Sequence, residues 1–177
     1  MSYVKGQDPT TLREVVDVFA CKERLAEIAT WRSFPALLER VWLMKVIGKA
    51  SEALSIAEEA VLVARTSGSR KDLLRARVLH ATVLQRLGSF EIADQILASC
   101  ASEAEVKGWT SLAAFTNQHR GNNYFDAGDY AAAREGFKKA LFLRFESGAD
   151  EQRIESVLLA IEAADRRRRD SGVGSSA

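Results

Sequence analysis

Apolar and polar residues follow a helical pattern along the chain, and the pattern repeats. Stretches of about fourteen residues carry apolar side chains at intervals of three and four, which is the spacing of one face of an α-helix. Glycines separate these stretches, and one glycine recurs every forty residues, at Gly48, Gly88 and Gly128. Because glycine adopts the left-handed backbone without penalty just past a helix end, each position is predicted to be a turn between two helices.

Further columns of residues keep the same forty-residue interval. A second glycine column is predicted to close the second helix of each unit, and small or apolar residues recur within that helix. The columns are Gly68, Gly108 and Gly148; Ala53, Ala93 and Ala133; Ala60, Cys100 and Ala140; and Ala57, Leu97 and Phe137. Small side chains leave no bulk between helices, so we expect the two antiparallel helices of each unit to approach closely.

Polar residues mark the predicted helix starts. Ser89 and Asp129 directly follow their glycines and are good N-caps, and Ser69 and Asp72 have the spacing of a capping box. Pro35 disfavours helix in the residue before it but suits a first helical turn, so a new helix is predicted to begin there. These signals place three helical hairpins at about residues 34–68, 70–108 and 110–148.

The two ends of the chain differ from the repeats. Residues 150–169 predict a capping helix with a polar outer face and an apolar stripe, as the end of a repeat array requires. A helix is also predicted from Thr11 to about Ile28, as the second half of a degenerate unit. Residues 1–9 are expected to be extended or disordered, the glycine-rich residues 170–177 disordered, and no strands are expected.

The repeat resembles the tetratricopeptide repeat (TPR) family, over roughly residues 34 to 148. The third unit carries the family's signature spacing best, the second less fully and the first least. The matching residues are Gly121, Tyr124, Gly128, Tyr130, Ala133, Phe137 and Ala140; then Leu84, Gly88, Phe90, Ala93 and Leu97; then Gly48, Ala53, Ala57 and Ala60. The family's early tryptophan and terminal proline are absent, and the period is forty rather than thirty-four, as in longer-helix variants found in bacterial regulators and cargo adaptors.

The resemblance implies an all-α fold, a right-handed α-α superhelix of the TPR-like solenoid kind. Three helical hairpins would stand between an N-terminal helix and a C-terminal capping helix, in one domain over residues 10–169.

Charge and cysteine content narrow the function classes. Twenty-five basic against twenty-four acidic residues leave a formal charge of +1, so no overall field would draw the chain to nucleic acid or to a membrane surface. Cys21 and Cys100 lie far apart without a CxxC pattern, which is typical of reduced thiols and predicts a cytoplasmic location. The first residues show no signal-peptide pattern, and no apolar run approaches the length of a membrane span.

The sequence offers little chemistry for catalysis. Its two histidines, His80 and His119, fall at different positions of successive units, and hydrolase, nucleotide-binding and dinucleotide-binding motifs are absent, so we expect no enzyme, cofactor or metal. The run Arg166–Arg169 allows a nucleic-acid or acidic-lipid contact. The interpretation we favour is that these cations complement a helix carboxyl terminus, with Glu162 and Asp165 offsetting them.

By the resemblance, the first helix of each hairpin lines a concave wall. That wall would mix aromatic, amide and charged groups, which suits a peptide or a helix of a partner protein better than a polyphosphate. The residues predicted to bind are Trp42, Lys45, Arg75, Leu79, Thr82, Arg86, Phe115, Gln118, His119, Asn122 and Phe125. Trp42, Phe115 and Phe125 are the expected anchors, and Asn122 or Gln118 the expected hydrogen-bonding groups, although Phe125 equally suits a core position.

The leading hypothesis is therefore a non-enzymatic interaction module that binds a peptide or helix of another protein. A self-associating regulatory subunit is a second hypothesis, in which the predicted helix from Thr11 to Ile28 or the final helix mediates homodimers. Apolar residues left over in the degenerate end units, such as Val15, Val16 and Phe19, motivate it. A small chaperone for a secreted client is a third. A receptor for chaperone carboxyl termini is disfavoured, because the family's clamp positions hold Leu38, Trp42, Leu79, Phe115 and His119 here.

Overall fold

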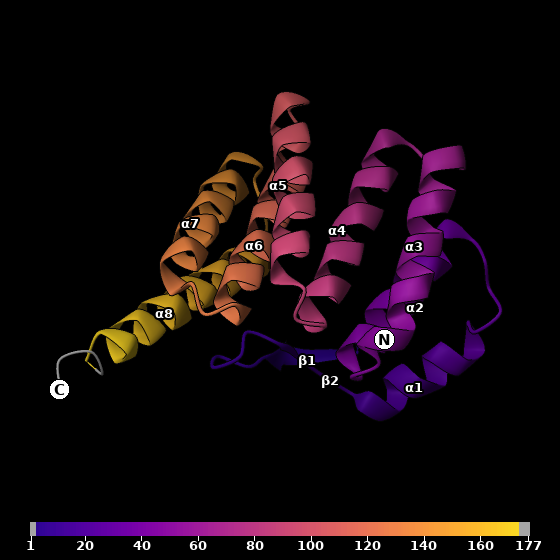
Figure 1. Cartoon of the computed structure of the whole chain (residues 1–177), viewed down its shortest axis with the longest axis horizontal. Helices are drawn as coiled ribbons and strands as arrows, with labels where there is room; N and C mark the ends of the chain where they lie inside the picture. The colour runs from indigo at the N-terminus through magenta and orange to yellow at the C-terminus, as the bar shows by residue number, and fades with distance from the viewer. Residues whose placement is uncertain (1–2, 174–177) are drawn as a thin grey trace. The chain divides into compact units, whose positions relative to one another are not determined.

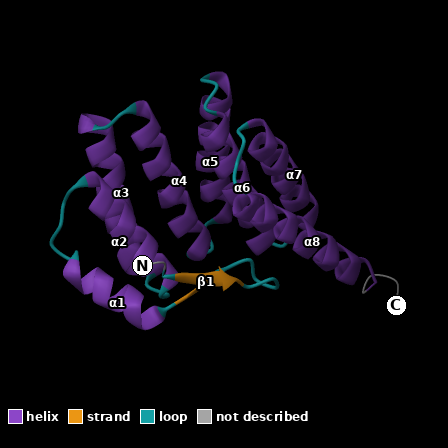
Figure 2. Cartoon of the chain, turned by 180° about the vertical axis from the view of Figure 1, so that it is seen from behind, coloured by secondary structure: helices purple, strands orange, loops and turns teal. Residues whose placement is uncertain are grey.

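The computed structural model describes residues 3–173, which form helices and one short strand pair (Figures 1 and 2). In this part of the chain the elements are β1 (Val4–Gln7), β2 (Glu14–Val16), α1 (Val18–Glu27), α2 (Phe34–Val46), α3 (Ala50–Ser67), α4 (Arg70–Arg86), α5 (Phe90–Val106), α6 (Thr110–Asp126), α7 (Tyr130–Glu146) and α8 (Glu151–Val173). The predominantly helical fold predicted from the periodicity is confirmed.

The chain forms two compact units. Among the described residues, unit 1 holds 3–7 and 14–96, and unit 2 holds 8–13 and 97–173, so the boundary falls within α5. In unit 1, α2 packs against α1, α3 and α4, and α3 packs against α4; in unit 2, α7 packs against α6 and α8. Within each unit, helices that follow one another in sequence therefore pack together, as a helical repeat requires. The single domain expected over residues 10–169 stays a prediction.

The predicted turns are confirmed at the first glycine column. Gly48, Gly88 and Gly128 all have positive φ angles, of 85°, 80° and 84°. The second column is mixed, because Gly108 and Gly148 are left-handed whereas Gly68 has a φ of −90° and an extended backbone. A helix can thus end at this column with or without a left-handed residue.

Two of the predicted helix starts make their side-chain caps. Ser69 accepts a hydrogen bond from the Asp72 backbone, and the Asp72 side chain accepts one from the Ser69 backbone, which completes the capping box of α4. Asp129 accepts from the backbone N–H of Ala132 at the start of α7. At α2, Ser33 holds the N-cap position without a side-chain hydrogen bond, and proline occupies the first turn.

The small residues of the repeat lie where the helices meet. In unit 1, Ala53 and Ala57 of α3 are buried in a cluster with Val41 of α2 and Val83 of α4. A second cluster in this unit joins Leu37, Ala60, Ala64 and Ala76. Alanine at these positions allows three helices to share one core without large gaps between their backbones.

In unit 2, two glycines bring α6 and α7 close together. A Cβ placed on Gly136 of α7 would lie 3.1 Å from the Cα of Gly121 of α6, and one placed on Gly121 would lie 2.5 Å from two ring atoms of Phe137. Phe137 is fully buried. The two glycines therefore leave room for the aromatic ring between the helices.

The N-terminal prediction is wrong in two respects. Strands were not expected, yet β1 and β2 pair antiparallel, with Val4 opposite Val16 and Gln7 opposite Glu14. The helix predicted from Thr11 begins only at Val18, where the Asp17 side chain caps it by accepting from Ala20. The physical reason is local, because β-branched Val15 and Val16 fit a strand and aspartate is a better N-cap than a helix-interior residue.

The loop between the strands, residues 8–13, belongs to unit 2. Hydrogen bonds to Asp8 and the burial of Leu12 hold it in place. The Asp8 carboxylate accepts hydrogen bonds from the backbone N–H groups of Thr10 and Thr11, which lower its pKa. Leu12 has a φ of 57°, unusual for a residue with a side chain, and is only 7% exposed. Burial of this leucine among residues of α6, α7 and α8 offsets the strain in its backbone.

At the other end, α8 extends beyond the predicted residue 169 to Val173. The helix-favouring arginines continue its hydrogen-bonded backbone, and Ser171 donates from its hydroxyl to the carbonyl of Arg167. The prediction of a disordered tail is therefore wrong for residues 170–173. Its remaining residues, 174–177, lie outside the described part of the chain.

Candidate functional site

One face of α6 in unit 2 brings together four of the predicted binding residues. Phe115, Gln118, His119 and Asn122 stand at intervals of three and four, so they share a single stripe along the helix. Each is partly buried rather than fully covered. Gly121 lies against α7, where an added Cβ would meet Phe137. Gln118 of the stripe also reaches α7 and α8, so the stripe borders the α6–α7 contact.

Two aromatic rings on this face form a defined platform. The Phe115 and His119 rings meet edge to face, with centroids 4.5 Å apart and an interplanar angle of 82°. Such a pair is stabilised by the ring quadrupoles and holds both side chains in fixed orientations. The platform offers an apolar contact to a ligand at little cost in side-chain entropy.

Asn122 is the polar group on this face that lacks its own partner. Its Oδ1 atom is buried from solvent and accepts no hydrogen bond within the described structure. A buried carbonyl without a donor costs free energy, and native proteins pair the great majority of such groups. The Asn122 acceptor is therefore unsatisfied in this structure, and its side chain must rotate to expose Oδ1 before an N–H donor of a bound segment can reach it.

Gln118 connects three helices of unit 2. Its Oε1 accepts a hydrogen bond from Nη2 of Arg144 on α7 at 3.1 Å, and its Nε2 donates to Oγ of Ser156 on α8 at 3.3 Å. Arg144 is only 7% exposed. Burial is the largest cause that lowers the pKa of its guanidinium; nearby Arg153 also lowers this pKa, and Asp150 partly opposes the shift.

Phe125 is placed in the core rather than on an open surface. It is 6% exposed and belongs to the buried cluster that contains Leu12, Phe137 and Val157, and its ring meets Tyr130 edge to face at 5.3 Å. Of the two roles considered for Phe125, the structure supports core packing over that of a ligand anchor.

In unit 1 the predicted residues of α2 and α4 meet each other. Lys45 is 6% exposed and Thr82 is 3% exposed, and the Lys45 ammonium donates to the Thr82 hydroxyl at 3.4 Å. Trp42 packs partly against the cluster of Cys21, Ile28 and Leu43. These side chains therefore serve the packing of unit 1, which leaves a ligand less of their surface than the sequence suggested.

The remaining predicted residues of unit 1 differ in exposure. Leu79 packs partly against the alanine-lined core. Arg75 is exposed and pairs with Asp72 on its own helix at 3.2 Å. Arg86 is more enclosed and lies 3.7 Å from a carboxylate oxygen of Glu14 on β2. These three residues do not form one continuous stripe like that of α6.

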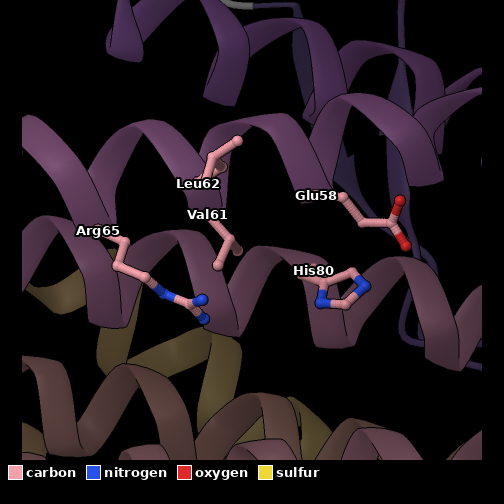
Figure 3. A pocket seen from close by; sticks show the side chains of 5 residues that line it. All are labelled: Glu58, Val61, Leu62, Arg65 and His80. Carbon is pink, nitrogen blue, oxygen red and sulfur yellow. The ribbon is translucent and has the colours of Figure 1, made fainter.

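A small hollow that the sequence did not predict lies between α3 and α4 (Figure 3). Its volume is about 170 Å³, and Figure 3 shows its five lining side chains, Glu58, Val61, Leu62 and Arg65 from α3 and His80 from α4. Burial lowers the pKa of His80, and the charge of Glu58 partly opposes this. The hollow is open and shallow, so it holds no enclosed small-molecule site.

Arg144 is a buried charged residue that the sequence interpretation did not single out. The equivalent positions of the first two units, forty and eighty residues earlier, are Ala104 and Ala64. Both alanines are buried, at 0% and 2% exposure. An arginine in a column of buried alanines was therefore the sequence signal for an unusual buried charge.

The described residues were also searched for a metal site and for a membrane-spanning helix. No group of three or more histidine, cysteine, aspartate or glutamate side chains among them is arranged to hold a metal ion. No helix in residues 3–173 combines the length and hydropathy of a membrane span.

Comparison with known proteins adds no family. The chain matches no protein-family model, and no curated protein sequence is similar to it.

Proposed function

We propose that the protein is a non-enzymatic interaction module of the TPR-like kind, which binds an extended segment of another protein along the partly buried face of α6 that carries Phe115, His119 and Asn122. The observation that carries this proposal is the buried Oδ1 of Asn122, which has no donor although it stands beside the Phe115–His119 platform. When the Asn122 side chain rotates outward, a backbone N–H of an extended segment supplies the missing donor, and an apolar side chain of that segment packs on the platform.

The test uses peptides selected from a display library against the full chain. Asn122→Leu removes the unpaired amide, so the variant is expected to fold with unchanged or higher stability while the selected peptide binds about tenfold more weakly. Phe115→Ala is expected to weaken binding by a similar factor through loss of the platform. Binding is measured by titration calorimetry.

Lys138→Ala is the matched control, because Lys138 is exposed on α7 and its nearest partner is Glu135 on the same helix. It is expected to leave the peptide affinity within a factor of two of the unmodified chain. The proposal fails if Asn122→Leu and Phe115→Ala bind the selected peptides as tightly as Lys138→Ala does.

Self-association is a second candidate function, supported by the N-terminal part of unit 1. Phe19 is 71% exposed, Val15 47% and Val18 46%, which places three apolar side chains in solvent within a short segment. Sedimentation velocity over a wide concentration range tests it. Dimers that dissociate in Phe19→Ser support this function, whereas a monomer at every concentration removes it.

A further inference from the structure

A row of four side chains on α3 borders the hollow between α3 and α4 (Figure 3). The row consists of Glu58, Val61, Leu62 and Arg65, and His80 of α4 completes the lining. Figure 3 shows Glu58 and Arg65 at opposite ends of the row, with the two apolar side chains between them. The hollow has a volume of about 170 Å³. Because it is open and shallow, it suits a side chain that protrudes from another protein surface.

The row combines an uncovered apolar side chain with two charges that have no ion-pair partner. Leu62 is 59% exposed. Glu58 and Arg65 are exposed as well, and within residues 3–173 neither forms a salt bridge. An exposed leucine between two unpaired charges is a surface that a partner of matching shape and charge can cover.

The spacing of the row makes it complementary to itself. Glu58 and Arg65 are seven residues apart, so they lie on nearly the same line along the helix, separated by about two turns. Leu62 lies between them, four residues after Glu58 and three before Arg65. If a second α3 packs antiparallel about a two-fold axis near Leu62, each glutamate comes opposite the arginine of the other copy. The two leucines then meet at the axis, where each faces the hollow of the other copy.

We propose that two copies of this chain form a homodimer through antiparallel α3 helices. Leu62 of each copy packs into the hollow of the other, and a Glu58–Arg65 pair forms on each side of the axis. Such a dimer is a form of self-association, the second candidate function, but it uses α3 instead of the N-terminal segment. One helix supplies most of the contact, so the buried area stays below about 1,200 Å² and the dimer is weak.

Charge reversal tests this pairing, by sedimentation velocity of the full chain at low salt over a wide concentration range. The unmodified chain is expected to show a monomer–dimer equilibrium. Glu58→Arg places arginines opposite each other and Arg65→Glu places glutamates opposite each other, so each variant alone is expected to be monomeric. An equal mixture of the two variants is expected to form heterodimers, because every arginine then meets a glutamate of the other chain.

Two further variants separate the contributions of charge and apolar packing. Glu146→Arg is the matched control, because it changes the net charge as Glu58→Arg does but at an exposed position of α7. It is expected to dimerise like the unmodified chain. Leu62→Ser keeps both charges and removes the apolar centre, so it is expected to raise the dissociation constant of the dimer about tenfold.

Circular dichroism checks that each variant is folded. Arg65 stands in the last turn of α3, where a cation complements the helix dipole, so Arg65→Glu carries a cost in stability of its own. Should Arg65→Glu fail to fold, Glu58→Arg and Leu62→Ser decide the matter against Glu146→Arg.

Several results overturn the proposal. They are a monomer at every concentration, a dimer that persists in Glu58→Arg and Leu62→Ser, and a mixture of folded charge variants that stays monomeric. A dimer that dissociates in Phe19→Ser but not in Leu62→Ser assigns self-association to the N-terminal segment and excludes α3. Asn122→Leu is expected to dimerise like the unmodified chain, so failure of the dimer and failure of peptide binding at α6 are separate results.

Discussion

Replacing Gly121 with alanine is expected to destabilise the protein, although alanine is the better helix former. The new Cβ would lie 2.5 Å from Cδ1 and Cε1 of Phe137 and 3.1 Å from its Cγ. The ring is fully buried, and Ala133 and Phe125 belong to the same buried cluster, so the ring cannot swing aside without disturbing them. Helices α6 and α7 must therefore move apart to accommodate the new methyl group.

Two opposing contributions set the magnitude. Alanine in a helix interior gains about 1 kcal/mol over glycine. Overpacking of a filled core costs about 1–3 kcal/mol, and two contacts at 2.5 Å place Gly121→Ala in the upper half of that range. The expected net loss in the free energy of unfolding is about 1–2 kcal/mol, which corresponds to about 2–8 °C in the midpoint for a chain of this size.

The assay is urea unfolding followed by circular dichroism, arranged as a double-mutant cycle with Phe137→Leu. In the Phe137→Leu background the clash is relieved, so Gly121→Ala is expected to stabilise by about the helix-propensity gain of 1 kcal/mol. The change of sign between backgrounds measures the contact directly. Equal stabilisation by Gly121→Ala in both backgrounds would contradict the close approach of α6 and α7 at this glycine.

Three further predictions concern single residues. Ser69→Ala removes the capping box of α4 and is expected to lower the free energy of unfolding by about 1 kcal/mol, measured by urea unfolding; an unchanged value contradicts the cap. Leu12→Gly is expected to destabilise less than Leu12→Ala by about 1 kcal/mol, because glycine tolerates the φ of 57°, and the reverse order argues against strain at Leu12. Burial lowers the folded-state pKa of His80 from 6.5 while Glu58 partly opposes this; the unfolded chain therefore binds the proton more readily, and stability falls as the pH drops below 6.5. In His80→Gln the urea midpoint is expected to change less between about pH 7.5 and about pH 5.5, and an identical pH dependence in both chains excludes this contribution of His80.

The repeat could be predicted from sequence because local rules and packing agree at its positions. Gly48 needs a left-handed backbone, Ser69 needs only a partner three residues later, and Ala53 needs a close neighbour helix. Each requirement is visible within one forty-residue period, and those of Gly48 and Ala53 recur in the next unit at Gly88 and Ala93. The recurrence of these residues therefore supported the prediction of helical hairpins more strongly than one helix-like stretch could.

The N-terminal hairpin could not be predicted in the same way. Its strands have four and three residues, too few for an alternating pattern to stand out. Leu12 adopts its unusual backbone because of contacts with residues more than a hundred positions later in the chain. Long-range packing of this kind leaves no local signal.

The candidate site was predicted in part, for the same reason. The stripe of Phe115, His119 and Asn122 follows from helical spacing, and the structure leaves it partly open. The burial of Lys45 against Thr82 depends on how α2 meets α4, which spacing along one helix does not define. The sequence therefore indicated which residues share one face of a helix. It did not indicate which of these faces a neighbouring helix covers.

The most direct test of the binding face is hydrogen exchange of the full chain with and without a peptide selected against it. The proposed function predicts slower exchange along α6 when peptide is bound, and no change on the outer side of α7, where Phe142 and Phe145 are each 61% exposed. Protection confined to α7, with α6 unchanged, would contradict the assignment of α6 as the surface that binds a partner.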